Sequence, residues 1–192
     1  MHIIESFFFM KIIEKSEIKR YIDYVAADRF VTYGEIKKNL DDAIKSGYLC
    51  VCVPPSFLNW SKKYVGDRIR ICSLVDFPLG NATVNTKVAS IKEGLKNGAD
   101  EFEVMINHNE LKSGNVEFVR RELLQLKRAA RRKLFKAAAE PSVLSETELY
   151  TFLKCALNTR TDYVSIGTSF GISYGANLLE KIKESVKGAI KI

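Results

Sequence analysis

Short apolar segments alternate with longer amphipathic segments along almost the whole chain. The apolar segments have the length of buried strands, and those between them have the spacing of helices with one apolar face. We expect strands at 22–26, 48–53, 68–75, 100–107, 134–139, 163–167 and 188–192. We expect helices at 32–47, 56–64, 85–97, 115–132, from Ser145 onward, and at 176–186.

Two of these helices carry a reciprocal cap at the start. Thr32 is followed three residues later by Glu35, and Ser145 is followed three residues later by Glu148. In such a capping box each side chain accepts a hydrogen bond from the backbone of the other residue. The first helix then ends at Gly47, a residue type that is typical just after a helix.

Regular alternation of strands and helices with short connections predicts a parallel α/β architecture. An open, doubly wound sheet fits this pattern, but its nucleotide-binding form needs glycines after the first strand, and the AADR sequence at 26–29 has none. A (β/α)8 TIM-barrel type of fold is the better interpretation, although it is incomplete, with about seven strands. We expect a single barrel domain at 21–192. Its gap would be left open, filled by a partner chain, or covered by an N-terminal segment or helix at 1–20.

Four motifs occur in a fixed order from the second strand onward. They are CVPP at 52–55, VDFPLG at 75–80, GADEFEVMIN at 98–107 and LKSGN at 111–115. Together they resemble the motifs of the deoxyribose-phosphate aldolase family. The resemblance implies a barrel enzyme that splits 2-deoxyribose 5-phosphate into glyceraldehyde 3-phosphate and acetaldehyde. It also implies a class I mechanism that uses a Schiff base and needs neither a metal nor another cofactor.

The resemblance also implies where the catalytic side chains lie. The family's imine-forming lysine on strand six is matched by Ser165, its second lysine by Lys191, its proton-relay aspartate by Glu103, and its strand-one aspartate by Asp23. A hydroxyl group cannot form a Schiff base, because only an amine condenses with an aldehyde to an imine. We therefore expect an impaired or inactive aldolase, in which Lys191 or Lys136 is the amine left to take over.

Substrate contacts are implied at Cys52 and at the exit of strand six. Gly167, Thr168 and Ser169 stand where the family has a Thr-Ser-Thr-Gly turn, but their order differs. Backbone amides in such a turn bind phosphate only when the local conformation directs them toward it. The changed order is a second reason to expect weak binding of a sugar phosphate.

Strand alternation places five charged side chains inside the barrel: Glu101, Glu103, Lys136, Glu140 and Lys191. Buried charges are costly unless they are paired, so we expect the pairs Lys136–Glu140 and Lys191–Glu103. A carboxylate neighbour raises the pKa of an amine and makes it a poor nucleophile. A charge-satisfied interior without imine chemistry is therefore favoured over an imine on either lysine.

Composition changes this picture little. No apolar run approaches the ~20 residues of a membrane span, and the start of the chain has no basic region typical of a signal peptide, so we expect a cytoplasmic protein. Cysteines at 50, 52, 72 and 155 do not have the spacing of a zinc site, and we expect reduced, buried thiols and no metal.

The net charge of +7 raises the question of partners. Its densest run, at 127–133, ends a helix and has no interleaved aromatic residues, so a basic nucleic-acid-associated protein is a remote alternative. An open barrel has unpaired strand edges, which favour pairing with another chain. We expect a homo-oligomer or a partner chain. The main alternative to an enzyme is a non-catalytic partner or regulatory subunit of an aldolase.

Overall fold

A curved sheet of six parallel strands lies at the centre of the computed structural model, which describes residues 17–28, 30–168, 176–186 and 190–191. The strands are β1 (Asp23–Val25), β2 (Cys50–Val53), β3 (Arg70–Val75), β4 (Glu101–Met105), β5 (Leu134–Ala139) and β6 (Tyr163–Ile166). The α-helices are α1 (Tyr33–Ser46), α2 (Pro55–Val65), α3 (Val84–Lys96), α4 (His108–Lys112), α5 (Val116–Ala129), α6 (Glu146–Asn158) and α7 (Ala176–Val186). Two 3-10 helices are η1 (Ile18–Tyr21) and η2 (Pro141–Val143).

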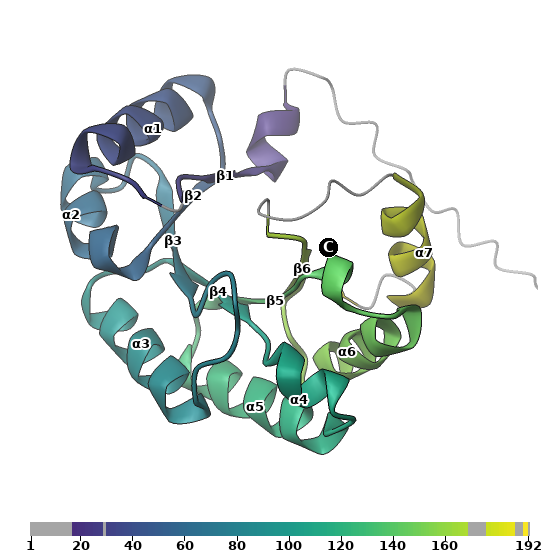
Figure 1. Ribbon diagram of the computed structural model, residues 1–192. Coiled ribbons are helices and arrows are strands. Elements are labelled where there is room, and N and C mark those ends of the chain that lie inside the picture. The colour runs from purple at the N-terminus through teal and green to yellow at the C-terminus, as the bar shows by residue number, and fades with distance from the viewer. Residues whose placement is uncertain (1–16, 29, 169–175, 187–189, 192) are drawn as a thin grey trace, which may run out of the picture.

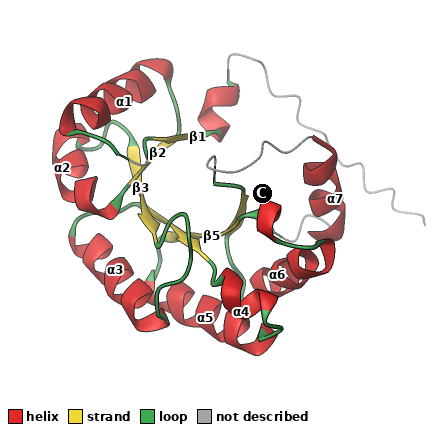
Figure 2. Ribbon diagram, in the orientation of Figure 1, coloured by secondary structure: helices red, strands yellow, loops and turns green. Residues whose placement is uncertain are grey.

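The strands are arranged in chain order, β1 to β6, and each is parallel to its neighbours. Figure 1 shows the sheet curling on itself while the long helices form an outer layer around it. Figure 2 shows the same arrangement as inner strands and outer helices. The predicted TIM-barrel type is therefore confirmed as a curled, partly closed barrel.

The two faces of the sheet have different chemistry. The outward face packs against the helices in a continuous apolar core, with fully buried residues such as Phe102, Phe135 and Phe152. The inward face carries a small separate cluster of three cysteines and Leu74, together with most of the charged strand residues. Burial of the outward face stabilises the fold by roughly 25 cal/mol per Å² of apolar surface. Because the apolar core lies on that face, the inward face is available for polar groups.

Both predicted capping boxes are present. The Thr32 side chain accepts a hydrogen bond from the Glu35 amide, and Glu35 bonds back to the Thr32 backbone. Ser145 and Glu148 make the same reciprocal pair at the start of α6. These side chains satisfy amides that have no partner within the helix.

Several predicted elements and boundaries differ from the structure, most of the strands being shorter by one to three residues. Helix α5 ends at Ala129 rather than 132, and Arg131 has the left-handed φ of 57°, which is incompatible with a continuing helix. Helix α4 was not predicted, because five residues are too few to show a helical period. Of the expected seventh strand, residues 187–189 and 192 lie outside the described residues, and Lys191 forms an isolated parallel bridge with Tyr163.

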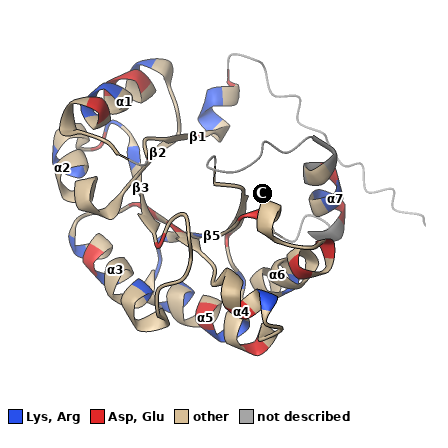
Figure 3. Ribbon diagram, viewed as in Figure 1, with Lys and Arg blue, Asp and Glu red and all other residues tan. Residues whose placement is uncertain are grey.

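The outer surface mixes charges of both signs. Figure 3 shows acidic and basic positions interspersed over the helices. Within the described part of the chain, no helix combines the length and the apolar character needed to cross a membrane. Residues 1–16 lie outside the described residues, so the separate N-terminal segment at 1–20 remains a prediction.

Candidate active site

Strand register brings most of the predicted site residues to one inward face. Asp23 is paired with Cys50 across β1 and β2, and Cys52 is paired with Cys72 across β2 and β3. On the other side, Glu103 is paired with Lys136, which is paired with Tyr163. Because side chains alternate along a strand, these residues and Ser165 all point into the curled sheet.

Lys136 is the charged centre of this interior. Its Nζ lies 2.6 Å from Glu101 Oε2 and also makes an ion pair and hydrogen bond with the Asp23 carboxylate. Burial alone would lower the pKa of Lys136, but the carboxylates of Asp23 and Glu101 act in the opposite direction, and the pKa lies above its ordinary value. Lys136 is therefore a protonated structural cation rather than a free amine.

The predicted partner of Lys136 was wrong. Glu140 follows Lys136 by four positions in an extended segment, and four residues of strand span about 13 Å. Glu140 instead accepts hydrogen bonds from the Thr168 amide, at 2.9 Å, and the Thr168 hydroxyl, at 2.7 Å. Lys136 reaches across the interior to β1 and β4.

Glu103 and Ser165 form the second part of the site. Burial raises the pKa of Glu103, while Lys136 and a hydrogen bond with Ser165 act in the opposite direction. Ser165 thus stands at the predicted position on β6 and serves as a hydrogen-bond partner of the predicted proton-relay carboxylate. Neither side chain supplies an amine.

Three thiols line the same interior. Cys50, Cys52 and Cys72 are free and fully buried. Burial raises the pKa of the Cys72 thiol to about 11, so it is neutral near pH 7. A hydrogen bond with Cys50 lowers the pKa of the Cys52 thiol, but a hydrogen bond with Cys72 and burial raise it well above its ordinary value. A neutral thiol is a poor nucleophile, so Cys52 lines the interior without being activated for attack.

Lys191 lies away from Glu103, and the predicted ion pair between these two residues was wrong. The Lys191 amine lies 5.3 Å from the centroid of the Tyr163 ring, and its side chain is exposed. Tyr163 begins β6, two residues before Ser165, which corresponds to about 6.6 Å along the strand. The bridge to Tyr163 therefore places Lys191 near the amino end of β6.

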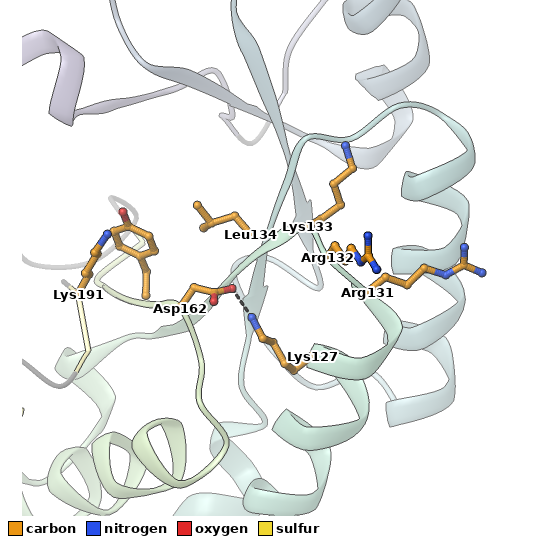
Figure 4. Close-up of a pocket in the computed structure, with 8 residues that line it drawn as sticks. Lys127, Arg131, Arg132, Lys133, Leu134, Asp162 and Lys191 are labelled. Atoms are coloured by element: carbon orange, nitrogen blue, oxygen red, sulfur yellow. Dashed lines mark hydrogen bonds and ion pairs between the residues drawn. The ribbon is translucent and has the colours of Figure 1, made fainter.

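That end of the sheet opens into a basic pocket. The pocket has a volume of ≈ 450 Å³ and is lined by Lys127, Arg131, Arg132, Lys133, Leu134, Asp162, Tyr163 and Lys191. Figure 4 shows the ion pair between Lys127 and Asp162 within it. The pocket holds the most basic run of the sequence on the side where β5 and β6 begin.

The predicted phosphate-binding turn is already engaged by the protein. Gly167 has a left-handed φ of 93°, and the next amide, that of Thr168, donates to the Glu140 carboxylate. A carboxylate at this amide occupies a position that an anionic ligand would need. Ser169 lies outside the described residues.

Sequence reasoning missed a buried anchor beneath the loop after β3. Lys87 on α3 is fully buried, and its Nζ donates to Glu122 Oε1 on α5 at 2.8 Å, to the Met105 carbonyl oxygen at 2.8 Å and to the Gly80 carbonyl oxygen at 3.0 Å. The loop that begins at Asp76 is thereby tied to two helices. The lysine after the VDFPLG motif was the available signal, but periodicity alone assigns it to a helix surface.

His108 was also missed as a site residue. Its Nε2 accepts a hydrogen bond from the Glu140 amide at 3.0 Å. Burial lowers the pKa of His108, and a hydrogen bond with the Leu79 backbone only partly offsets this. A neutral imidazole therefore connects the loop after β3 with the end of β5.

Comparison with known proteins gives a consistent set of relatives. The deoxyribose-phosphate aldolase of Caldicellulosiruptor saccharolyticus is 32% identical over 190 residues, covering 92% of this chain and 86% of the relative. That of Clostridioides difficile is 30% identical over 166 residues, covering 86% and 75%. No family model matches the chain.

Solved structures agree with these sequence relatives. The aldolase QR15 has a TM-score of 0.87 at 26% identity and covers 91% of this chain and 79% of its own. A tetrameric deoxyribose phosphate aldolase from Aeropyrum pernix has a TM-score of 0.82 at 19% identity, covering 92% and 75%. The second likeness concerns the fold alone.

Proposed function

This chain belongs to the deoxyribose-phosphate aldolase family, and we propose that it has kept the family's barrel while losing the Schiff-base step of the aldol reaction. The observation that carries this proposal is Ser165, which stands on the inward face of β6 beside Glu103 in place of an amine. The reaction begins with condensation of an amine and a carbonyl, which a hydroxyl cannot perform.

The two remaining candidate amines do not take over this role. Lys136 is held protonated between Asp23 and Glu101, and an ammonium group has no lone pair for attack on a carbonyl. Lys191 is exposed beside Tyr163 near the amino end of β6. Barrel enzymes bind substrate at the opposite, carboxyl end of the strands, so Lys191 is badly placed for a substrate held there.

Imine trapping tests the proposal directly. The protein is incubated with deoxyribose 5-phosphate, or with acetaldehyde, and then with borohydride, and the modified peptides are mapped by mass spectrometry. We expect no stoichiometric adduct at an interior residue, and only the scattered labelling of surface lysines that unfolded protein also shows. A stoichiometric adduct on Lys136 or Lys191 in the folded protein would overturn the proposal.

Restoring the amine separates loss of the nucleophile from loss of substrate binding. Ser165→Lys supplies the missing group, and Ser165→Met controls for side-chain length without an amine. An adduct at position 165 in the lysine variant alone means that the serine accounts for the defect. If no adduct forms, substrate positioning is also lost, because the Thr168 amide is engaged by Glu140. Orientation is worth ~7–11 kcal/mol in well-aligned reactions.

A second function, as a non-catalytic partner, is favoured by the edge of the sheet at β1. This strand has only three residues and pairs on one side with β2 in the described sheet. Large apolar side chains next to it are about half exposed: Ile18 at 48%, Tyr21 at 53% and Ile22 at 41%. Exposed edges beside apolar patches favour association. We propose that this edge binds a second copy of the chain or a related aldolase in the cytoplasm.

Light scattering of the purified protein tests this association. We expect a dimer or larger assembly that Ile22→Glu dissociates, whereas Val116→Glu, which places the same charge at a similarly exposed residue of α5, leaves it intact. A monomeric wild-type protein that also fails to bind an active family member would exclude the partner role. Neither result depends on imine chemistry.

A further inference from the structure

Two sulfur atoms and a carboxylate converge on the inward face of β2, β3 and β4. Cys52 and Cys72 are directly paired across β2 and β3, and Glu103 lies on the next strand, opposite Leu74. The two Sγ atoms and a carboxylate oxygen of Glu103 all lie within 4.8 Å of one another. Thiolate sulfur and carboxylate oxygen are ligands that a borderline-soft divalent cation accepts together.

Charge in the interior points the same way. Three inward carboxylates, from Asp23, Glu101 and Glu103, face one inward lysine, Lys136. Lys136 pairs with Asp23 and Glu101, and Arg70, at the rim of the interior, also lies 2.9 Å from the Glu101 carboxylate. Asp23 and Glu101 therefore both have a basic partner. Among the described residues, Glu103 has a hydrogen bond with Ser165 but no ion pair. Glu103 is only partly exposed, a carboxylate largely withdrawn from water is costly without a counter-charge, and a bound cation would provide one.

A second triad of similar composition, Asp23, Cys50 and Glu101, lies in the same interior. Lys136 Nζ already occupies it, since it contacts both carboxylates. An ammonium group and a metal ion compete for the same oxygens. This triad is therefore filled by the protein's own cation, and of the two triads among the described residues, the one of Cys52, Cys72 and Glu103 is left for an external ion.

We propose that Cys52, Cys72 and Glu103 form a binding site for a thiophilic divalent cation of the Zn²⁺ type. Zinc takes four ligands in a tetrahedron, at about 2.3 Å for sulfur and about 2.0–2.2 Å for carboxylate oxygen. Three come from the triad, and the fourth is water or the Ser165 hydroxyl beside Glu103. To reach these bond lengths, rotation of the three side chains brings the donor atoms about 1 Å closer together than the 4.8 Å within which they now lie. Both thiol protons leave to solvent as the metal binds.

Access to the site is through Glu103. Both cysteines are fully buried, whereas Glu103 keeps partial exposure toward the open interior. Lys136 lies close enough to weaken binding of any cation, but its charge is balanced by Asp23 and Glu101. The site is thus open on its carboxylate side and closed on its sulfur side.

Cobalt substitution tests the proposal on the full chain. Co²⁺ bound by thiolates shows an intense near-ultraviolet charge-transfer band that oxygen ligands alone do not give. We expect one equivalent of Co²⁺ to produce this band, and Zn²⁺ to abolish it. The variants Cys52→Ser and Cys72→Ser should each weaken binding by more than the about 10- to 100-fold that changes outside the ligand set cause. Cys155→Ser, at a buried cysteine on α6, should bind like the wild type.

Glu103→Gln keeps both thiols, so it tests the site even if the serine variants fail to fold. It should retain the charge-transfer band with weaker affinity. The proposal is overturned if folded wild-type protein gives no such band, or if both serine variants keep it. It is equally overturned if Cys155→Ser loses the band, because the metal would then bind elsewhere. Circular dichroism establishes which variants are folded.

Discussion

Replacing Lys136 by methionine tests whether the interior of the barrel depends on one lysine. Methionine keeps the length and apolar volume of the side chain and removes only the ammonium group. In the wild type, this group lies 2.6 Å from Glu101 and also contacts Asp23. The side chains of Lys136 and Glu101 are only 7% and 2% exposed, so water cannot replace the lost contacts.

The expected loss is large on the scale of protein stability. Breaking a buried ion pair by removing one partner costs about 3–5 kcal/mol, because a charge stays buried without compensation. Natural domains are stable by about 5–15 kcal/mol. With a urea dependence of about 2 kcal/mol per molar, the midpoint of unfolding should fall by about 1.5–2.5 M.

Urea unfolding followed by circular dichroism, in buffer with a chelator, measures this shift. Lys37→Met is the matched control, because Lys37 pairs with Asp41 at 2.8 Å while both side chains are about half exposed. Exposed pairs contribute about 0–1 kcal/mol. The double variant Lys136→Met/Glu101→Gln should recover part of the loss, because it removes the more buried of the two carboxylates that lose Lys136, and only Arg70 at the rim then remains beside Glu101. Equal midpoints for Lys136→Met and Lys37→Met would refute the reasoning.

Three further predictions concern the framework around the site. Gly80→Ala should lower the melting temperature more than Gly114→Ala does. Both glycines have a left-handed φ, which costs other residues about 1–2 kcal/mol, but of the two only Gly80 has a backbone oxygen 1.9 Å from where an added Cβ would lie. Equal losses of melting temperature would show that the loop relaxes. Lys87→Met should destabilise by about 3–5 kcal/mol, with partial recovery on adding Glu122→Gln, and urea midpoints that do not recover would contradict a direct pairing. Burial lowers the pKa of His108, so its contribution to stability is present above about pH 6.5 and is lost as the pH falls through the pKa of the folded state. His108→Gln should therefore flatten the plot of unfolding free energy against pH in that acidic range. An unchanged plot would assign the slope to other groups.

Much of the fold can be predicted from the sequence because it depends on hydrophobic periodicity and on the residues that begin and end helices. Caps at Thr32 and Ser145 and the stop at Gly47 are local signals, and the structure has them where they were predicted. The face to which each strand side chain points could be predicted equally well, since Glu103 and Ser165 share the inward face as alternation requires. The alternation of side chains between the two faces does not say, however, how far apart two inward residues lie.

The pairings inside the barrel were not readable for that reason. Lys136 was assigned to Glu140, which is near in sequence, but its partners are Asp23, which lies 113 residues away, and Glu101. Partner choice depends on the stagger of neighbouring strands, which no local pattern encodes. Lys87 was missed for a related reason, because its burial depends on how α3 and α5 pack against the loop after β3.

The order of the strands has a consequence for how the chain is made. Each strand of the described sheet after β1 hydrogen-bonds to the strand that precedes it in the sequence. Each pairing therefore closes a short loop, whose entropic cost grows only with the logarithm of its length. During translation the N-terminal units emerge first, and each new strand meets an edge that is already in register. Ribosomal stalling would leave a shorter sheet with native pairing, so synthesis and assembly can proceed in step.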